Sequence, residues 1–388
     1  MVRTDGPLTR AEVAERCGLS PAAVATRVSA LVNAGLLVES RAASTGGRPA
    51  SLLSFQPDAG VVLVADFGRT HSRLGVADLT GQLLAERPES RLLGTEPAAV
   101  LEWALDVFEE LLFEADRPRS AVVGIGVGVP GPIEFRGRPF HPPVLPGWDG
   151  VDIAAALRTR FDVVVVVDND ANAEAVGEHR STLRSIDDLL YVKCGTGIGC
   201  GVILGGTIRR GAQGASGEIG HVAVPSAAGI ECRCGNSGCL ETIASGRALA
   251  EQLTALGTRA ADAREVVAHL RRGEPNAARL IRAAGRALGE VLATAVDILN
   301  PAAIVVGGDL AAAEETLLTG IREEIYRRSS VLATRSLRIE RGSLGERAGV
   351  VGSAITVLDV VLAPSEIDRM LEAGGEYVVS AIGQAGGR

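Results

Sequence analysis

The sequence predicts a small winged helix-turn-helix domain in front of a larger α/β body. Three observations lead to this fold class. A chain of 388 residues is too long for one ordinary hydrophobic core, which favours two or three domains. Its first 55 residues read as helix, tight turn, helix and basic hairpin. The remainder carries apolar strands that end in glycine-containing turns.

The overall composition indicates a folded protein in a reducing compartment. Hydrophobic residues make up 46% of the chain, and 48 glycines indicate many tight turns. No apolar run reaches the roughly 18–20 residues that a membrane span needs. The N-terminus MVRTDGPLTR lacks the apolar segment of a secretion signal, so we expect a cytoplasmic protein whose six cysteines stay reduced. Lysine occurs once, at Lys193, against 38 arginines, a bias that is typical of a GC-rich genome.

The charge is divided unevenly along the chain. Residues 1–55 carry six arginines against four acidic residues, whereas the remainder carries 33 basic and 43 acidic residues. A body with this excess of negative charge does not attract nucleic acid in general. If operator DNA is a partner, the N-terminal segment must bind it.

Two short helices and a hairpin are predicted at the N-terminus. The first helix, over residues 7–18, begins with a capping-box pattern at Thr9. The second begins at Ser20, which is followed by proline at the first helical position. Residues 36–38 can pair with residues 52–55 as a hairpin. Together these elements are typical of a winged helix-turn-helix.

This domain, residues 1–56, is predicted to place its second helix in the major groove of DNA. The side chains offered to the groove are Ser20, Ala22, Ala23, Thr26 and Arg27. The narrow wing tip carries Arg48, which is suited to enter a minor groove. A small helical protein-interaction domain is the alternative. A complete winged helix has one more helix ahead of this pair, for which only MVRTDG remains, so we expect a shortened start.

Two strand–turn–strand units are predicted to surround phosphate groups with backbone N–H donors. Neither turn matches a Walker loop, which needs a strand-to-helix turn and a lysine, and a plain tight turn is the alternative for each. A third strand, residues 304–310, contains a glycine pair suited to close approach by an adenine or ribose. The residues concerned are Asp66, Gly68 and Thr70 in the first turn, Gly195, Thr196, Gly197 and Gly199 in the second, and Gly307 and Gly308 in the third strand.

A run of five valines, residues 163–167, predicts a strand that is buried on both faces. Asp168, Asn169, Asp170 and Asn172 follow it at the carboxyl end of the strand. In open α/β sheets, ligands bind at that end. An Asx-rich helix cap is the alternative role for Asp168 and Asn172.

The stretch SGEIGHVAVPSAAGIECRCGNSGCLE, residues 216–241, predicts a structural zinc site. Its four ligands are His221, Cys232, Cys234 and Cys239. One imidazole and three thiolates are a typical tetrahedral set, and four protein ligands leave no open position on the metal. Disulfide bonds are an unfavourable alternative, because two cysteines separated by one residue are too close to form an unstrained bridge. The expected compartment is also reducing.

The chain resembles the ROK family (repressors, open reading frames and kinases) over essentially its whole length. The motifs that carry the resemblance are DFGRT at 66–70, VPGPI at 129–133, PGWDGVDIA at 146–154, VDNDANA at 167–173, GTGIGCG at 195–201, GEIGH at 217–221 and CRCGNSGCLE at 232–241. The resemblance implies a body similar to actin and hexokinase, with two ribonuclease-H-like lobes around a cleft. We expect the lobes at 57–178 and 179–388, with the C-terminal helix packed back on the first.

The same resemblance implies a sugar site and the remains of a kinase site. The implied sugar ligands, for a hexose-type molecule, are Asn169, Asp170, Glu218, His221 and Glu241. In kinase members Asp170 matches the catalytic base, which acts with ATP and Mg²⁺. The chain departs from those members in the first phosphate turn, where Arg69 stands in place of a glycine that lets the backbone approach phosphate.

Two functions therefore compete. A sugar-responsive transcriptional regulator, bound to operator DNA as a homodimer or a dimer of dimers, is favoured because a plain kinase has no use for the N-terminal domain. An ATP-dependent sugar kinase with an N-terminal extension is the alternative.

Overall fold

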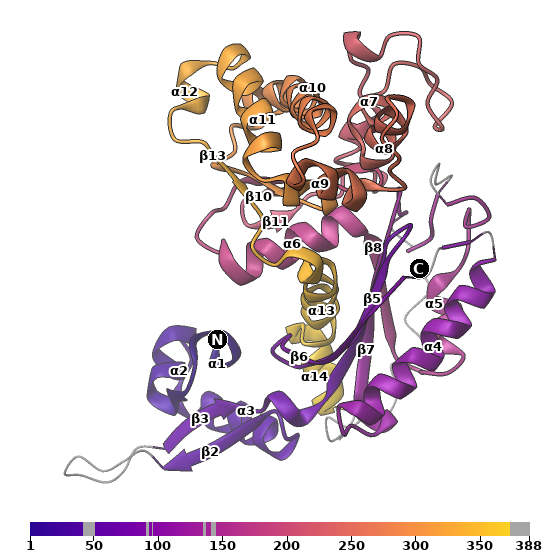
Figure 1. Cartoon of the computed structure of the whole chain (residues 1–388). Coiled ribbons are helices and arrows are strands. Elements are labelled where there is room, and N and C mark those ends of the chain that lie inside the picture. Colours follow the sequence, from indigo (N-terminus) through magenta and orange to yellow (C-terminus); the bar gives the residue numbers. More distant parts are fainter. Residues whose placement is uncertain (42–50, 91–92, 95, 135–136, 141–144, 373–388) are drawn as a thin grey trace.

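The computed structural model describes residues 1–41, 51–90, 93–94, 96–134, 137–140 and 145–372. Within them, three β-sheets organise the molecule: a three-stranded sheet near the N-terminus and two five-stranded sheets. Figure 1 shows the N-terminal elements at the opposite end of the molecule from α10, α11 and α12, with α13 near its centre. The predicted small domain and two-lobed body are confirmed.

The N-terminal domain has the predicted helix-turn-helix and hairpin. Thr9 forms a capping box with Glu12 at the start of α2, and the Ser20 side chain accepts a hydrogen bond from the backbone of Ala23 in α3. The small sheet has the order β1-β3-β2. Its elements are α1 (Val2–Asp5), β1 (Leu8–Thr9), α2 (Arg10–Cys17), α3 (Pro21–Asn33), β2 (Leu37–Arg41) and β3 (Ser51–Phe55).

The first lobe contains a sheet of order β6-β5-β4-β7-β8. Strands β4, β5 and β6 are antiparallel, whereas β7 and β8 run parallel to β4. One face packs on α4 and α5 and the other on α13. The elements are η1 (Pro57–Ala59), β4 (Val61–Phe67), β5 (Ser72–Asp78), β6 (Leu83–Glu89), α4 (Pro97–Glu114), η2 (Arg119–Ala121), β7 (Val122–Val129), α5 (Ile153–Arg158) and β8 (Val164–Asn169).

The second lobe repeats this arrangement. Its sheet has the order β11-β10-β9-β12-β13, with three antiparallel strands followed by two parallel ones. Helices α7 to α11 pack on one face and α6 on the other. The strands are β9 (Leu189–Cys194), β10 (Ile198–Leu204), β11 (Thr207–Ile208), β12 (Ala303–Gly307) and β13 (Arg338–Arg341). The remaining helices, of which α13 and α14 pack against the first lobe, are α6 (Asp170–Thr182), η3 (Ile219–His221), η4 (Pro225–Ala227), α7 (Glu241–Ala244), α8 (Gly246–Ala255), α9 (Ala263–Arg271), α10 (Pro275–Leu299), η5 (Asp309–Ala313), α11 (Glu315–Arg328), α12 (Val331–Thr334), η6 (Gly345–Arg347), α13 (Ala348–Val361) and α14 (Pro364–Glu372).

Two sequence-based expectations need correction. The valine strand β8 lies at the edge of its sheet, so Val164, Val166 and Val167 are only partly buried, although helices cover both faces. The strand predicted over residues 304–310 ends at Gly307, and η5 follows it.

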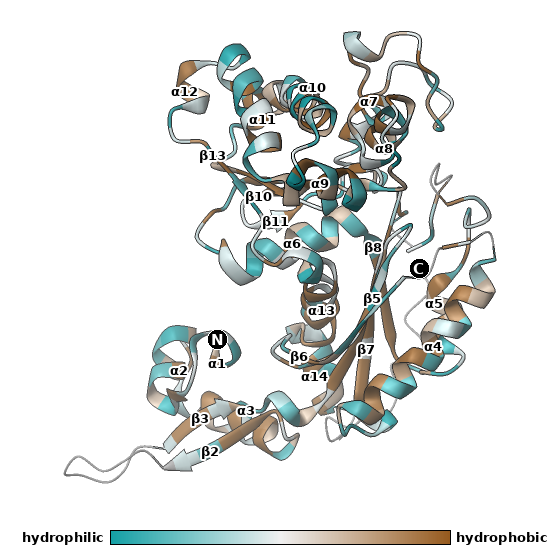
Figure 2. Ribbon diagram, in the orientation of Figure 1, coloured by the Kyte–Doolittle hydropathy of each residue, from teal (hydrophilic) through white to brown (hydrophobic). Residues whose placement is uncertain are grey.

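The lobes meet where α6 crosses α13. Glycine is required on both sides of this crossing: a Cβ at Gly177 would lie 2.3 Å from the Ala348 carbonyl oxygen, and one at Gly352 would lie 1.7 Å from that of Ala173. Figure 2 shows α13 as one of the most hydrophobic helices, consistent with its position between the lobes. The start of α6, which carries the predicted ligand residues, is thereby held at the lobe junction.

The N-terminal domain packs against the C-terminal helices. Leu36 is buried in the same hydrophobic cluster as Val357 and Leu358 of α13. Arg27 of α3 forms an ion pair of 2.9 Å with Asp368 of α14. No single helix among the described residues is long and apolar enough to span a membrane, although the bent pair formed by residues 345–361 and 364–372 passes a test of length and composition.

Candidate ligand cleft and metal cluster

A cavity of about 510 Å³ contains every residue predicted for sugar or phosphate binding. Its walls come from the ends of β4, β8, β9 and β12 and from the segment before α7. The predicted residues that line it are Asp66, Gly68, Thr70, Asn169, Asp170, Gly195, Thr196, Gly197, Gly199, Glu218, His221, Glu241, Gly307 and Gly308. Residues separated by more than 200 positions in sequence therefore meet in one cavity.

Asn169 and Asp170 begin α6 at the floor of this cavity. The Asn169 side chain caps the helix by accepting from the Asn172 backbone at 3.1 Å, and its amide donates to the Gly131 carbonyl at 3.0 Å. One amide hydrogen of Asn169 is left for a ligand. Asp170 is 8% exposed and accepts from the Ala171 backbone at 2.8 Å. Both side chains are thus held in fixed orientations by local hydrogen bonds.

Asp168 makes structural contacts, although the helix cap predicted as its alternative role belongs to Asn169. One carboxylate oxygen accepts from the Asn169 backbone and the Asn172 amide, and the other accepts from the Arg210 guanidinium at 2.6 Å. These contacts tie the segment after β11 to the end of β8.

The four predicted metal ligands lie together. Cys232 Sγ is 3.7 Å from His221 Nδ1, Cys234 Sγ is 3.7 Å from Cys239 Sγ, and all four ligand atoms lie within 4.8 Å of one another. Sulfur atoms bound to one tetrahedral zinc at about 2.3 Å are separated by nearly the same distance. The donor set and its spacing therefore fit a zinc ion.

His221 connects this cluster to the cavity. Because Nδ1 faces the thiol groups, Nε2 points away from them and lies 3.7 Å from Glu218 Oε2. Burial, together with the charges of Asp170 and Glu241, raises the pKa of Glu218 to about 7. Glu241 is 4% exposed and accepts from the Ile198 backbone at 3.2 Å. The metal cluster and the second glycine turn thus position three polar side chains of the cavity, those of His221, Glu218 and Glu241.

The first phosphate turn is tight, and Arg69 lies at the cavity wall. The backbone N–H of Gly68 donates to the His71 carbonyl at 2.9 Å. Arg69 is half-buried and makes no ion pair within the described part of the chain. Burial, and then the charges of Arg233 and Arg247, lower its pKa. Arg69 therefore adds positive charge beside the turn and leaves the turn accessible from the cavity.

The glycine pair after β12 is needed for packing, whatever the cavity binds. A Cβ at Gly307 would lie 1.7 Å from the Tyr191 hydroxyl, and one at Gly308, where φ is +79°, would lie 2.6 Å from the Cys194 backbone. These contacts bring β12 against β9 at the point where both strands end.

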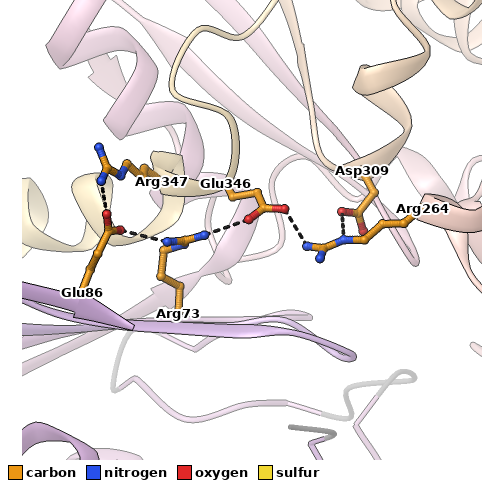
Figure 3. A network of polar contacts seen from close by, with 6 residues as sticks. All are labelled: Arg73, Glu86, Arg264, Asp309, Glu346 and Arg347. Atoms are coloured by element: carbon orange, nitrogen blue, oxygen red, sulfur yellow. Dashed lines mark hydrogen bonds and ion pairs between the residues drawn. The ribbon is translucent and has the colours of Figure 1, made fainter. Parts of the chain in front are cut away.

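A row of charged side chains crosses the mouth of the cavity next to this glycine pair. Arg73 bonds Glu86 at 2.9 Å and Glu346 at 2.8 Å. Arg264 continues the row, with contacts of 2.8 Å to Glu346 and 2.9 Å to Asp309. Figure 3 shows the row, with Arg347 paired to Glu86 at its other end. It joins β5 and β6 of the first lobe to α9 and η5 of the second through Glu346, whose side chain is 58% exposed, so the ion pairs between the lobes open at little cost.

Two charged residues of the cleft were missed by sequence reasoning. Lys193 lies 2.8 Å from Asp170 and 2.6 Å from Glu174. The available signal is that Lys193 is the only lysine in the chain, but an arginine-rich composition typical of a GC-rich genome accounts for that as well. Glu174 gave no signal, because a glutamate within a helix is ordinarily exposed.

The predicted DNA-contacting residues divide into three groups. Ser20, Ala22, Ala23 and Thr26 are exposed at the start of α3. Arg27 is also exposed but pairs with Asp368, so a role in DNA binding requires that ion pair to open. Arg48 lies outside the described residues.

Comparison with known families agrees with this architecture. The profile of the ROK family matches residues 62–360, and a profile described as winged helix-turn-helix DNA-binding matches residues 1–38. The chain belongs to the ROK family. Among curated relatives, a putative xylose repressor of Caldicellulosiruptor sp. is 30% identical over 372 residues, which is 92% of this chain and 93% of that protein.

Two solved ROK structures show the breadth of the family. A ROK family transcriptional regulator, a homologue of the E. coli MLC protein, superposes with a TM-score of 0.81 and 24% identity over 95% of this chain and 96% of that chain. The ROK hexokinase from Thermus thermophilus superposes with a TM-score of 0.63 and 34% identity over 77% of this chain and 99% of that chain. The structural match to the regulator therefore includes the N-terminal domain as well as the body.

Proposed function

We propose that this ROK protein is a sugar-responsive transcriptional repressor that acts in the cytoplasm. The observation that carries the proposal is the presence of a winged helix-turn-helix and a polar interlobe cleft in one chain, packed against each other. The similarity to a putative xylose repressor over 92% of the chain supports it. The winged helix would bind operator DNA and the cleft a monosaccharide.

The proposed ligand is a neutral sugar of hexose type. Its hydroxyl groups would be bound by Asn169, Asp170, Glu218, His221 and Glu241, which line one cavity. Adjacent hydroxyls need paired donors and acceptors, and this set supplies carboxylate, amide and imidazole groups. A structural zinc ion, held by His221 and the three cysteines, would fix the orientation of the imidazole.

Communication between cleft and DNA is proposed to run through the C-terminal helices. Glu178 of α6 accepts from the Leu344 backbone at 2.7 Å, and Leu344 immediately precedes η6 and α13. Helix α13 packs under the first sheet, and α14 follows it to the Arg27–Asp368 ion pair. A change in lobe angle on sugar binding would therefore move α14 against the DNA-contacting helix. A homodimer would present two such helices to a palindromic operator.

An ATP-dependent sugar kinase is the second candidate. The observation that favours it is that both glycine turns, Asp66 and Asp170 line the same cavity, together with 34% identity to a ROK hexokinase. The two candidates are separated by one paired assay: ADP release and operator binding, each measured with a panel of hexoses, pentoses and amino sugars. Sugar-dependent change in operator binding without ATP supports the repressor. Sugar-dependent ADP release on the order of 1–100 per second would establish the kinase.

Operator binding is expected to require the N-terminal domain. Arg48→Ala should weaken binding about tenfold and reduce its salt dependence, because a cation near the DNA backbone or minor groove is lost. Arg27→Ala should have a similar effect if Arg27 leaves Asp368 in the complex. Gel shifts at two salt concentrations measure both, with the exposed Arg335→Ala as the matched control. A chain that begins at residue 57 and still shifts the operator would contradict the proposal.

A further inference from the structure

Lys193 places a single ammonium group among the acidic side chains of the cleft. Its Nζ lies 2.8 Å from Asp170 Oδ2 and 2.6 Å from Glu174 Oε1. The other oxygen of Glu174 accepts from the Tyr191 hydroxyl at 2.8 Å. The side chains of Lys193, Asp170 and Glu174 are 18%, 11% and 9% exposed. This is a largely buried ion cluster rather than a surface ion pair.

A third carboxylate belongs to the same cluster. Asp66 reaches the cavity from β4, and within the described residues its buried Oδ1 has no hydrogen-bond partner. Burial raises the pKa of Asp66 to about 7. Burial also opposes the charge of Lys193, but Asp170, Glu174 and Asp66 outweigh it and raise the pKa of Lys193 well above its usual range. The ammonium therefore stays charged and is the positive centre of the group.

Three carboxylates beside two glycine turns are the surroundings that a divalent cation needs in phosphoryl transfer. Here they do not fit such an ion, because the Lys193 ammonium already lies within hydrogen-bond distance of two of them. A chain with 38 arginines uses lysine at this point alone. An ammonium is a compact point charge, whereas a guanidinium is a larger planar group.

We propose that Lys193 is an internal cation that takes the place of a divalent metal beside Asp170. It holds the Asp170 carboxylate in position as a hydrogen-bond acceptor for a sugar hydroxyl. This inference deepens the proposed repressor function, on which it rests, since it explains how the cleft binds sugar without phosphorylating it. Lys193 is thus a positioning residue for Asp170.

The first test uses Mn²⁺ alone as the probe. Lys193→Met removes the ammonium but keeps a side chain of similar length and leaves the carboxylates together. The full-length variant is expected to bind about one Mn²⁺ that the native protein does not, as measured by the loss of the free Mn²⁺ paramagnetic resonance signal. The double variant Lys193→Met/Glu174→Gln should lose this binding again. Thermal unfolding of each variant checks that it is folded.

The second test is sugar affinity, measured by calorimetry with D-xylose and D-glucose in the presence and absence of Mn²⁺. Without the ammonium, Asp170 loses the partner that orients it, so the Lys193→Met variant should bind sugar about tenfold more weakly than the native protein. Added Mn²⁺ should restore the affinity of this variant, because the metal replaces the missing positive charge. Mn²⁺ should change neither the native protein nor the double variant. The groups that face the pair of Lys193 and Asp170 are Asp66 from β4, Glu174 from α6, Tyr191 from β9 and Glu218 from the segment before η3.

The outcomes separate this inference from the function on which it rests. Failure of both sugars to bind the native protein would count against the sugar ligand, while the Mn²⁺ result would still decide the role of Lys193. A folded Lys193→Met variant that binds no Mn²⁺ would overturn the inference, as would Mn²⁺ bound at this site by the native protein. The Glu174→Gln variant alone keeps the contact between Lys193 and Asp170. It therefore tests the role of the ion cluster if the Lys193→Met variant does not fold.

Discussion

Replacing Cys239 with serine is expected to remove the bound metal and to abolish sugar binding. Cys239 is 1% exposed and lies in the cluster with His221, Cys232 and Cys234. A structural zinc ion contributes on the order of 10 kcal/mol in small peptides, so even partial loss should lower the unfolding temperature by roughly 10 °C. Since His221 Nδ1 faces the thiols, loss of the metal also releases the imidazole and its contact with Glu218.

Metal analysis of protein purified without chelator, calorimetric sugar titration and thermal unfolding measure the three effects. Cys17→Ser is the matched control, because Cys17 is an exposed free cysteine on α2 and should leave metal content unchanged. Full sugar affinity in metal-free Cys239→Ser protein would show that the cluster does not support the cleft.

The Asp170→Asn variant is expected to bind sugar roughly 5- to 150-fold more weakly, equivalent to about 1–3 kcal/mol for a buried polar contact that is lost. Asp170 begins α6 and is aimed into the cavity by its contacts with Ala171 and Lys193. In a repressor this carboxylate only accepts a hydrogen bond, so the sugar concentration that changes operator binding should rise by the same factor. No ATP should be needed.

In a kinase the same substitution removes a base, so turnover would disappear while sugar binding stayed largely intact. Calorimetry and ADP release, measured on the same protein, distinguish these results. Asp162→Asn is the control, because Asp162 is exposed near the opposite end of β8. Unchanged sugar affinity in folded Asp170→Asn protein would remove Asp170 from the proposed sugar site.

Much of the architecture follows from short-range signals that the sequence alone contains. Thr9 and Ser20 cap α2 and α3 because a side-chain oxygen can satisfy an N–H group within the next three residues. The strands that end at Phe67 and Cys194 are recognisable from their apolar runs and the glycines that follow. The metal cluster can likewise be predicted from a short segment, since its four ligands lie within nineteen positions. Thiol and imidazole ligands in turn indicate the class of metal.

Only the tertiary structure decided which of these residues restrain one another. The contact between Lys193 and Asp170 joins residues 23 positions apart, and that between Arg27 and Asp368 joins residues 341 apart. No periodicity or spacing predicts such pairs, because they depend on how β9 packs under α6 and how α14 returns to the N-terminal domain. The edge position of β8 has the same origin, since a valine run specifies a buried strand but not its neighbours in the sheet. By itself the sequence determined the N-terminal winged helix-turn-helix, the α/β character of the body and the composition of the metal cluster, because each follows from local chemistry, whereas the two lobes were implied by the resemblance to the ROK family. The tertiary structure decided that Asp170 is paired with an ammonium and that Arg27 is held by the body, because charges in a folded chain are partnered across space.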